Sequence, residues 1–84
     1  MLIKVLAAEG DLTAASNVDT ATVVRLYNGH SGAVVITRKT GSTTIGSITV
    51  HQNHEIYLEK DPTDTLTASA GGSAVKVVKV AYAN

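Results

Sequence analysis

The fold is decided by a stretch in the first third of the chain that reads TATVVRLYN over residues 20–28. Successive side chains of a β-strand point to opposite faces, so Thr22, Val24 and Leu26 share one face of this predicted strand. Arg25 belongs to the opposite face. We expect Val24 and Leu26 to be the pair that enters the core.

A dense turn signal follows this strand directly. Residues 28–32 read NGHSG, and Asn and Gly tolerate the positive backbone φ that tight turns require. The next apolar segment, Ala33–Lys39, begins immediately afterwards. We therefore predict that a β-hairpin joins the two strands.

Further turn signals recur at short intervals, which is typical of a sandwich or a barrel. Gly46 is expected to mark a bulge or an edge, because Ile45 and Ile48 cannot otherwise share a face at a period of two. A short helical turn fits residues 12–16, and residues 61–64, DPTD, predict a type I turn. The other expected strands are Leu2 to Ala8, Thr44 to Val50 with Ile48 and Val50 inward, His54 to Lys60 with Ile56 and Leu58 inward, Thr65 to Ala70 with Leu66, Ala68 and Ala70 inward, and Val75 to Ala83.

The composition also favours strands. Val, Thr and Ile supply about a third of the 84 residues, and β-branched side chains fit a pleated sheet better than a helix. A chain of this length builds a single core. We predict one all-β domain over residues 1–84, a small antiparallel β-sandwich or barrel of about seven strands with a jelly-roll or immunoglobulin-like arrangement.

Charge and cysteine content exclude several function classes. Lys and Arg balance Asp and Glu at seven each, so no global field attracts polyanions. The absence of cysteine excludes a disulfide framework, a thiolate metal site and a cysteine nucleophile. The apolar start of the chain is short and is interrupted by Lys4, which predicts no export signal. We expect neither nucleic acid nor a membrane as a partner.

Histidines and carboxylates are the residues to consider for catalysis or metal binding. His51 and His54 would need a third ligand such as Glu55 or His30 to hold zinc, and residues three apart on a strand face opposite ways. We expect solvated loop histidines. Asp61 and Asp64 are explained by the turn they flank. No Gly-x-Ser-x-Gly motif occurs. The prediction is that the protein has no catalytic residue, no metal, no cofactor and no small-molecule substrate.

A small basic group is the remaining polar candidate. Arg25, Arg38 and Lys39 are expected to form a small basic patch at one end of the predicted hairpin, with Tyr27 available for stacking. Cations with an aromatic side chain are typical of an oligonucleotide-binding barrel. The simpler interpretation is a solvated hairpin.

The two ends of the chain differ from the interior strands because both of their faces are apolar. A strand of this kind lies centrally under a second layer or is covered by a partner. We predict that the ends form a partner or oligomer interface, and the alternative is that they pair centrally and loops cover their second faces. The predicted interface residues are Leu2, Lys4, Leu6, Val78, Val80 and Tyr82.

Five segments carry a resemblance to a known family. They are TVVRLYN at 22–28, AVVIT at 33–37, TIGSITV at 44–50, EIYLEKDPTDTL at 55–66 and VKVVKVAY at 75–82. Together they resemble small virion structural proteins of tailed bacteriophages, of the type known from marine and cyanobacterial hosts. The resemblance covers about residues 20–83 and implies a compact β-sandwich without catalytic residues.

The function expected from this resemblance is structural. It implies a non-enzymatic capsid decoration (cement) protein that stabilises the head shell, and the alternative within the virion is a neck or tail accessory protein. Its partners would be copies of itself, the major capsid protein or another virion protein, and its location would be the virion, assembled in the host cytoplasm. A small oligonucleotide- or carbohydrate-binding module is the alternative from another class.

Overall fold

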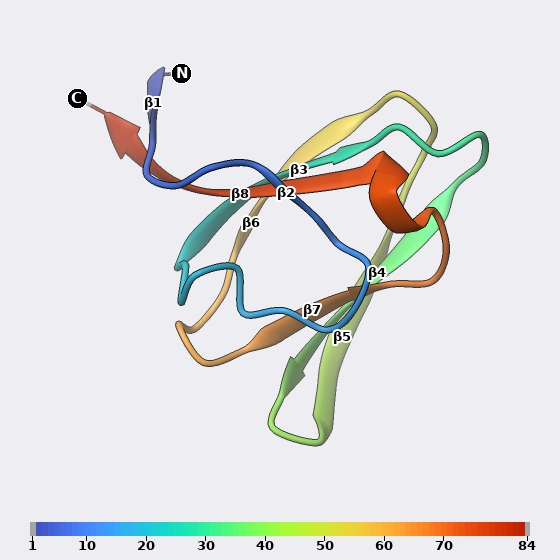
Figure 1. Cartoon of the computed structure of the whole chain (residues 1–84). Helices are drawn as coiled ribbons and strands as arrows, with labels where there is room; N and C mark the ends of the chain where they lie inside the picture. Colours follow the sequence, from blue (N-terminus) through green and yellow to red (C-terminus); the bar gives the residue numbers. More distant parts are fainter. Residues whose placement is uncertain (1, 84) are drawn as a thin grey trace.

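The computed structural model describes residues 2–83 as two antiparallel sheets that pack face to face (Figure 1). The first is a five-stranded sheet with the order β1-β8-β3-β6, in which β2 also pairs with β8, and the second is a three-stranded sheet with the order β5-β4-β7. Neither sheet closes on itself. The predicted all-β fold is confirmed. The strands are β1 (Leu2–Val5), β2 (Gly10–Asp11), β3 (Val23–Asn28), β4 (Val34–Thr40), β5 (Thr43–Val50), β6 (Glu55–Glu59), β7 (Thr65–Ala68) and β8 (Val75–Ala83).

The core lies between the two sheets. Val24 and Leu26 of β3 are fully buried there, as predicted, and pack with buried residues of β4, β7 and β8. Leu12 and Val18 from the loop before β3 complete the same cluster. The one helix among the described residues is the three-residue 3-10 turn η1 (Gly72–Ala74), and no helix there is long and apolar enough to span a membrane.

The predicted hairpin between the second and third expected strands is wrong. β3 belongs to the five-stranded sheet and β4 to the three-stranded sheet, so residues 28–33 form a corner between the layers. Asn28 builds this corner: its buried side-chain amide donates to the carbonyls of Gly32 at 3.0 Å and Val50 at 2.9 Å, and its Oδ1 accepts the His30 N–H at 2.9 Å. An Asn-Gly sequence indicates that the chain changes direction. It does not distinguish a hairpin within one sheet from a corner between two sheets.

β5 follows its predicted boundaries but not its predicted burial. The expected bulge is confirmed, because the pairing of β4 with β5 shifts by one residue opposite Ile45, next to Gly46. Val50 is buried, whereas Ile48 is 45% exposed although it was expected to point inward. Ile48 does point to the core side of its sheet, but no strand of the other sheet covers it completely. Ala70 was also expected inward and is exposed, since β7 ends at Ala68.

The helical turn expected at residues 12–16 does not form, and the loop between β2 and β3 instead contains a left-handed turn further along, at residues 18–20. Val18, Asp19 and Thr20 have φ values of 51°, 58° and 55°. L-amino acids with a Cβ adopt this region rarely, and β-branched residues least of all. Side chains stabilise the turn locally, because Ser16 Oγ accepts the Val18 N–H and Asn17 Oδ1 accepts the Thr20 N–H.

Candidate interaction surface

A two-stranded ribbon extends from the sandwich where β8 runs past its neighbour β3. β3 pairs with residues 75–80 of β8, whereas β1 pairs with residues 80–83. We call residues 2–6 and 80–83 the terminal arm. Figure 1 shows both chain ends in this arm, on one side of the molecule. The arm exists because β8 is nine residues long and β3 only six.

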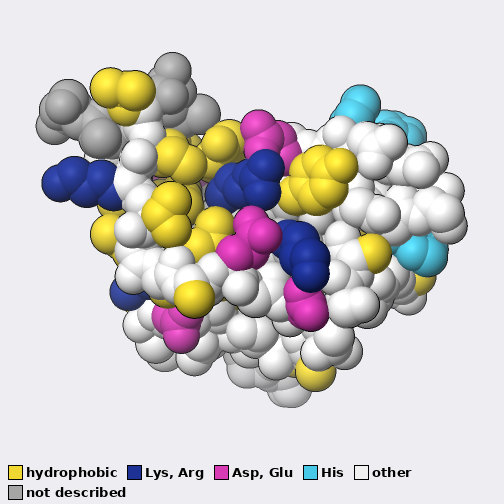
Figure 2. All heavy atoms as spheres, turned by 45° about the horizontal axis from the view of Figure 1, so that its top comes forward, with side chains coloured by type: hydrophobic (Ala, Val, Ile, Leu, Met, Phe, Trp, Pro, Cys, Tyr) yellow, Lys and Arg dark blue, Asp and Glu magenta, His cyan; other side chains and the backbone are white. Residues whose placement is uncertain are grey.

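The terminal arm carries most of the exposed large apolar side chains of the described residues. Leu2 is 70% exposed, Val5 66%, Leu6 49% and Tyr82 54%. Figure 2 shows hydrophobic side chains gathered at this end of the molecule, beside the chain termini. A contiguous apolar surface on a small domain is a characteristic of interaction sites.

Four of the six predicted interface residues lie on this exposed surface. Leu2, Lys4, Leu6 and Tyr82 are exposed. Val78 and Val80 are not, since only 5% and 2% of their surface is accessible. For these two the prediction of an outward-facing interface was wrong.

Val78 and Val80 are buried because this chain covers both faces of its five-stranded sheet in that region. Val78 lies opposite Arg25, and Val80 lies between Val23 and Val5. The segment that links β1 to β2 continues along β8, with the Leu6 N–H donating to the Lys79 carbonyl at 2.9 Å. The interpretation that loops cover the second face therefore applies to this half of β8.

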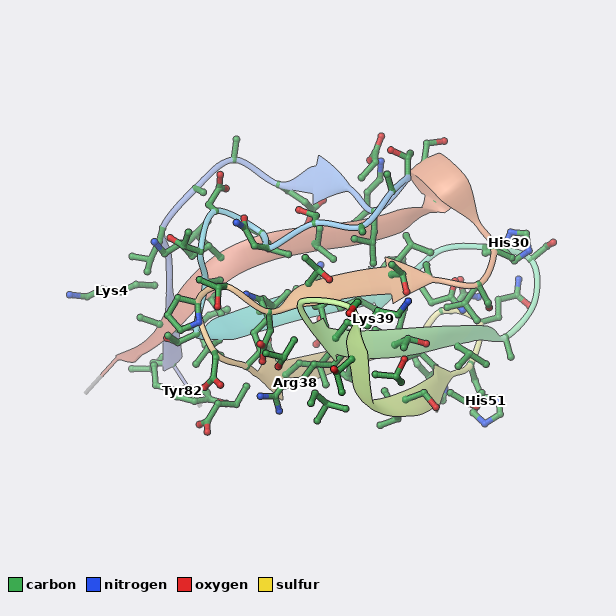
Figure 3. All side chains as sticks on the ribbon, turned by 90° about the horizontal axis from the view of Figure 1, so that it is seen from below. Lys4, His30, Arg38, Lys39, His51 and Tyr82 are labelled. Carbon is green, nitrogen blue, oxygen red and sulfur yellow. The ribbon has the colours of Figure 1, made fainter. Side chains whose placement is uncertain are left out.

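The backbone of the arm also has an open side. β1 pairs only with β8 among the described strands, so its other edge is free. Leu2, Lys4 and Leu6 alternate with Ile3 and Val5 and share one face of this edge strand. Figure 3 shows Lys4 pointing away from the body of the molecule, at the end opposite His30 and His51.

The basic group predicted near Tyr27 is divided between the two sheets. Arg25 of β3 pairs with Glu55 at 2.7 Å and with Glu9 at 3.3 Å, and its guanidinium lies 5.5 Å from the centre of the Tyr27 ring. Partial burial opposes the charge of this guanidinium, but the hydrogen bond to Glu55 and the charges of Glu55 and Glu9 outweigh it and raise the pKa of Arg25. The carboxylates of Glu55 and Glu9 therefore neutralise the positive charge of Arg25.

Arg38 of β4 is engaged elsewhere, in a partly buried polar cluster that sequence reasoning missed. Its Nε and Nη2 both lie 2.7 Å from Asp64 Oδ2, while Thr40 Oγ1 donates to the other Asp64 oxygen at 2.7 Å. Asp64 itself is completely buried. The hydrogen bond from Thr40 lowers the pKa of Asp64, Arg38 lowers it further, and together they outweigh the opposing effect of burial.

Lys60 belongs to the same region. It is 3% exposed, and its ammonium donates to the carbonyls of Ala21 at 2.7 Å and Asp61 at 3.2 Å. Burial lowers the pKa of Lys60, although the nearby Asp64 charge opposes this shift.

The DPTD motif correctly predicted a turn, since the Asp64 N–H donates to the Asp61 carbonyl. The motif gave no sign that Asp64 is buried, because its partners come from β4.

The histidines do not converge on a common point. The rings of His51 and His54 are 6.0 Å apart and meet edge to face. Within residues 2–83, no group of three or more His, Cys, Asp or Glu side chains comes together as a metal site would require.

These features define a class: a small antiparallel β-sandwich whose most exposed apolar side chains lie on a projecting arm with a free strand edge. Comparison of the chain with protein-family models, with curated proteins and with solved structures finds no match in any of the three.

Proposed function

We propose that this chain is a non-enzymatic structural protein of a tailed-phage virion, and specifically a decoration protein of the capsid. The terminal arm is the observation that carries the proposal. Exposed leucines next to an unpaired strand edge offer apolar area and backbone hydrogen bonds to the same partner. The family resemblance of residues 20–83 supports the virion as the setting.

The arm suits repeated, reversible attachment to a lattice. Burial of one exposed Leu or Val side chain contributes about 1.5–3 kcal/mol relative to leaving it in water. A few such side chains give one modest contact for each copy, and a shell presents many equivalent sites. A protein that binds the assembled shell and not its separated subunits stabilises the shell by its binding free energy. Cementing therefore needs no chemistry beyond association.

Reconstitution tests this function. Particles made by the encoding phage without this gene product are mixed with the purified chain and sedimented through a gradient. We expect the wild type to sediment with the particles at a fixed stoichiometry and to raise the temperature at which the shells open. A folded protein that stays at the top of the gradient would rule out the virion role.

Matched variants connect binding to the arm. Leu2→Asp combined with Leu6→Asp places two carboxylates on the exposed arm, and we expect it to weaken particle binding while the circular dichroism spectrum is unchanged. Thr13→Asp, on the exposed loop after β2, is the control and should bind like the wild type. Equal binding by both variants would remove the arm from the mechanism.

A further inference from the structure

The side of the sandwich formed by β5 and β6 is open. β5 is the last strand of the three-stranded sheet and β6 the last of the five-stranded sheet, so each has one neighbour and one free edge. Between these two edges lies a groove of ≈ 230 Å³. On the opposite side, the bridge between Ser16 and Leu66 covers the outer edge of β7.

The groove is largely apolar and has one acidic and one basic residue, Glu59 and Arg38, of which Arg38 is already paired with Asp64. Ile45 and Ile48 of β5 and Leu58 of β6 line it, and Glu59 lies beside them. The bulge next to Gly46 turns both isoleucines toward the groove, where they remain 52% and 45% exposed. Among the described residues, Glu59 forms no ion pair.

β5 also lacks the features that usually protect a sheet edge from pairing. Natural edges carry lysines, prolines or other charges that discourage another strand from adding to them. β5 reads TTIGSITV, with no charged residue and no proline in eight residues. Its bulge is the single protective feature it has.

The terminal arm has the complementary pattern. One of its faces presents Leu2 and Leu6 with Lys4 between them, and Lys4 forms no ion pair among the described residues. Five extended residues span about 16 Å, which is long enough to follow the groove wall from Ile45 to Ile48. In Figure 1 the arm and the tip of the β4–β5 hairpin lie at different ends of the molecule.

We propose that one partner of the terminal arm is a second copy of this chain, whose β5–β6 groove it enters. β1 of one copy then lies along the free edge of β5 in the next. Leu2 and Leu6 cover Ile45 and Ile48, and Lys4 meets Glu59. The contact joins two different surfaces, so it propagates from copy to copy into a ring or a chain. This inference rests on the proposed structural function and names one of its partners.

Mixing two variants tests the contact. Leu2→Asp blocks the arm and Ile48→Asp blocks the groove, and both positions are exposed enough to tolerate the change. In sedimentation velocity up to about 1 mM, we expect the wild type to form species larger than a dimer and each variant alone to remain monomeric. An equimolar mixture should form a 1:1 dimer and nothing larger, because only one competent arm and one competent groove remain.

Charge reversal provides the second measurement. Lys4→Glu and Glu59→Lys each place like charges in contact, and we expect each to weaken self-association about tenfold. Both changes in one chain restore the opposite-charge pair and should restore association. Such a recovery is specific to contact between these two residues and is not expected from partial unfolding.

Several outcomes would overturn the inference. They are a monomeric wild type, a Leu2→Asp variant that assembles normally, or a mixture that stays monomeric. If Ile48→Asp is monomeric while Leu2→Asp is still a dimer, the edge of β5 pairs with its own copy instead. A monomer that still sediments with particles would contradict this inference and leave the virion function intact, whereas self-assembly without particle binding would do the reverse.

Discussion

β8 and β5 are the two longest strands of the molecule, at nine and eight residues, and they have opposite environments. β8 pairs with β3 on one edge and with β1 and β2 on the other. Four of its valines are buried, and they lie on both of its faces. β5 pairs with β4 alone, and only its last residue, Val50, is buried.

The contrast shows that neighbours on all sides decide burial in a sandwich this small. Both strands are rich in β-branched residues, but β8 has neighbours on both edges along most of its length, whereas β5 has a neighbour on one edge only. Among the described residues, most exposed large apolar side chains lie where a strand lacks a neighbour, on the terminal arm and on the groove side of β5. The two surfaces proposed to bind each other therefore have the same structural origin, a strand with a free edge.

The largest expected difference between β8 and β5 comes from placing the same charge in each strand. Val80→Asp puts a carboxylate at a position of β8 that is 2% exposed, whereas Ile48→Asp puts it at one that is 45% exposed. An unpaired buried carboxylate costs several kcal/mol, a large part of the ~5–15 kcal/mol by which typical domains are stable. We expect Val80→Asp not to fold and Ile48→Asp to lose about 1 kcal/mol or less.

Circular dichroism and thermal melting measure both variants. If Val80→Asp keeps the wild-type spectrum and melts cooperatively, the side chain at position 80 is not buried in solution. Val78 and Val80 then return to the candidate interface. If Ile48→Asp fails to fold, the groove side of β5 is covered in solution.

A second prediction concerns β4, the strand on which β5 depends. Arg38 of β4 forms a hydrogen-bonded ion pair with the buried carboxylate of Asp64. Hydrogen bonds from Thr40 and Arg38 lower the pKa of this carboxylate. A carboxyl group with a lowered pKa in the folded state contributes stability above its unfolded-state pKa, and this contribution is lost as the pH falls through the folded-state value. We expect Asp64→Asn to lower the melting temperature by several degrees at pH 7, and the difference from the wild type to shrink in acid.

Asp61→Asn is the matched control. Asp61 contacts the same arginine at 3.7 Å, but its side chain is 76% exposed, and exposed pairs contribute little. Melting curves of both variants should be recorded from neutral pH to strong acid. A difference between Asp64→Asn and the wild type that does not change with pH would show that lost packing, and not the charge, explains the effect.

Most of the fold could be predicted from the sequence because alternation of apolar and polar residues is a local property. It gave every strand except the two-residue β2, the inward face of β3 and the bulge beside Gly46. It could not give the sheet to which each strand belongs. Asn28 illustrates the limit, since its turn signal is the same whether the chain pairs with itself or crosses to the other layer, and the partners Gly32 and Val50 decide.

The candidate surface was predictable only in part for the same reason. Both faces of the terminal strands read as apolar, which indicates a partner or a second layer without distinguishing them. Leu2 and Tyr82 are exposed because β3 does not extend past Val80, whereas Val80 itself has β3 on one side and β1 on the other. The groove depends on where β5 and β6 end relative to each other, and a single sequence does not contain that information.

The smallest predicted effect concerns backbone strain in the loop that packs Val18 against β8. Val18 is buried in the cluster that contains Val75 and Val77 of β8, and it reaches this position through the left-handed turn at residues 18–20. β5 has no such loop over it. Thr20 is exposed in this turn at a φ of 55°, a conformation that glycine adopts without the steric cost of a Cβ. Replacing it should therefore relieve strain without removing a core contact.

We expect Thr20→Gly to stabilise the protein by about 0.5–1 kcal/mol, because the strain relieved in the folded state exceeds the entropy that glycine adds to the unfolded chain. Thr13→Gly is the control, since Thr13 lies in the same loop, is exposed and does not have a positive φ. It should destabilise the protein by a similar amount. Urea unfolding of the three proteins gives the comparison. If both variants are destabilised equally, the left-handed turn carries no strain, and the cover over β8 is obtained without a local conformational cost.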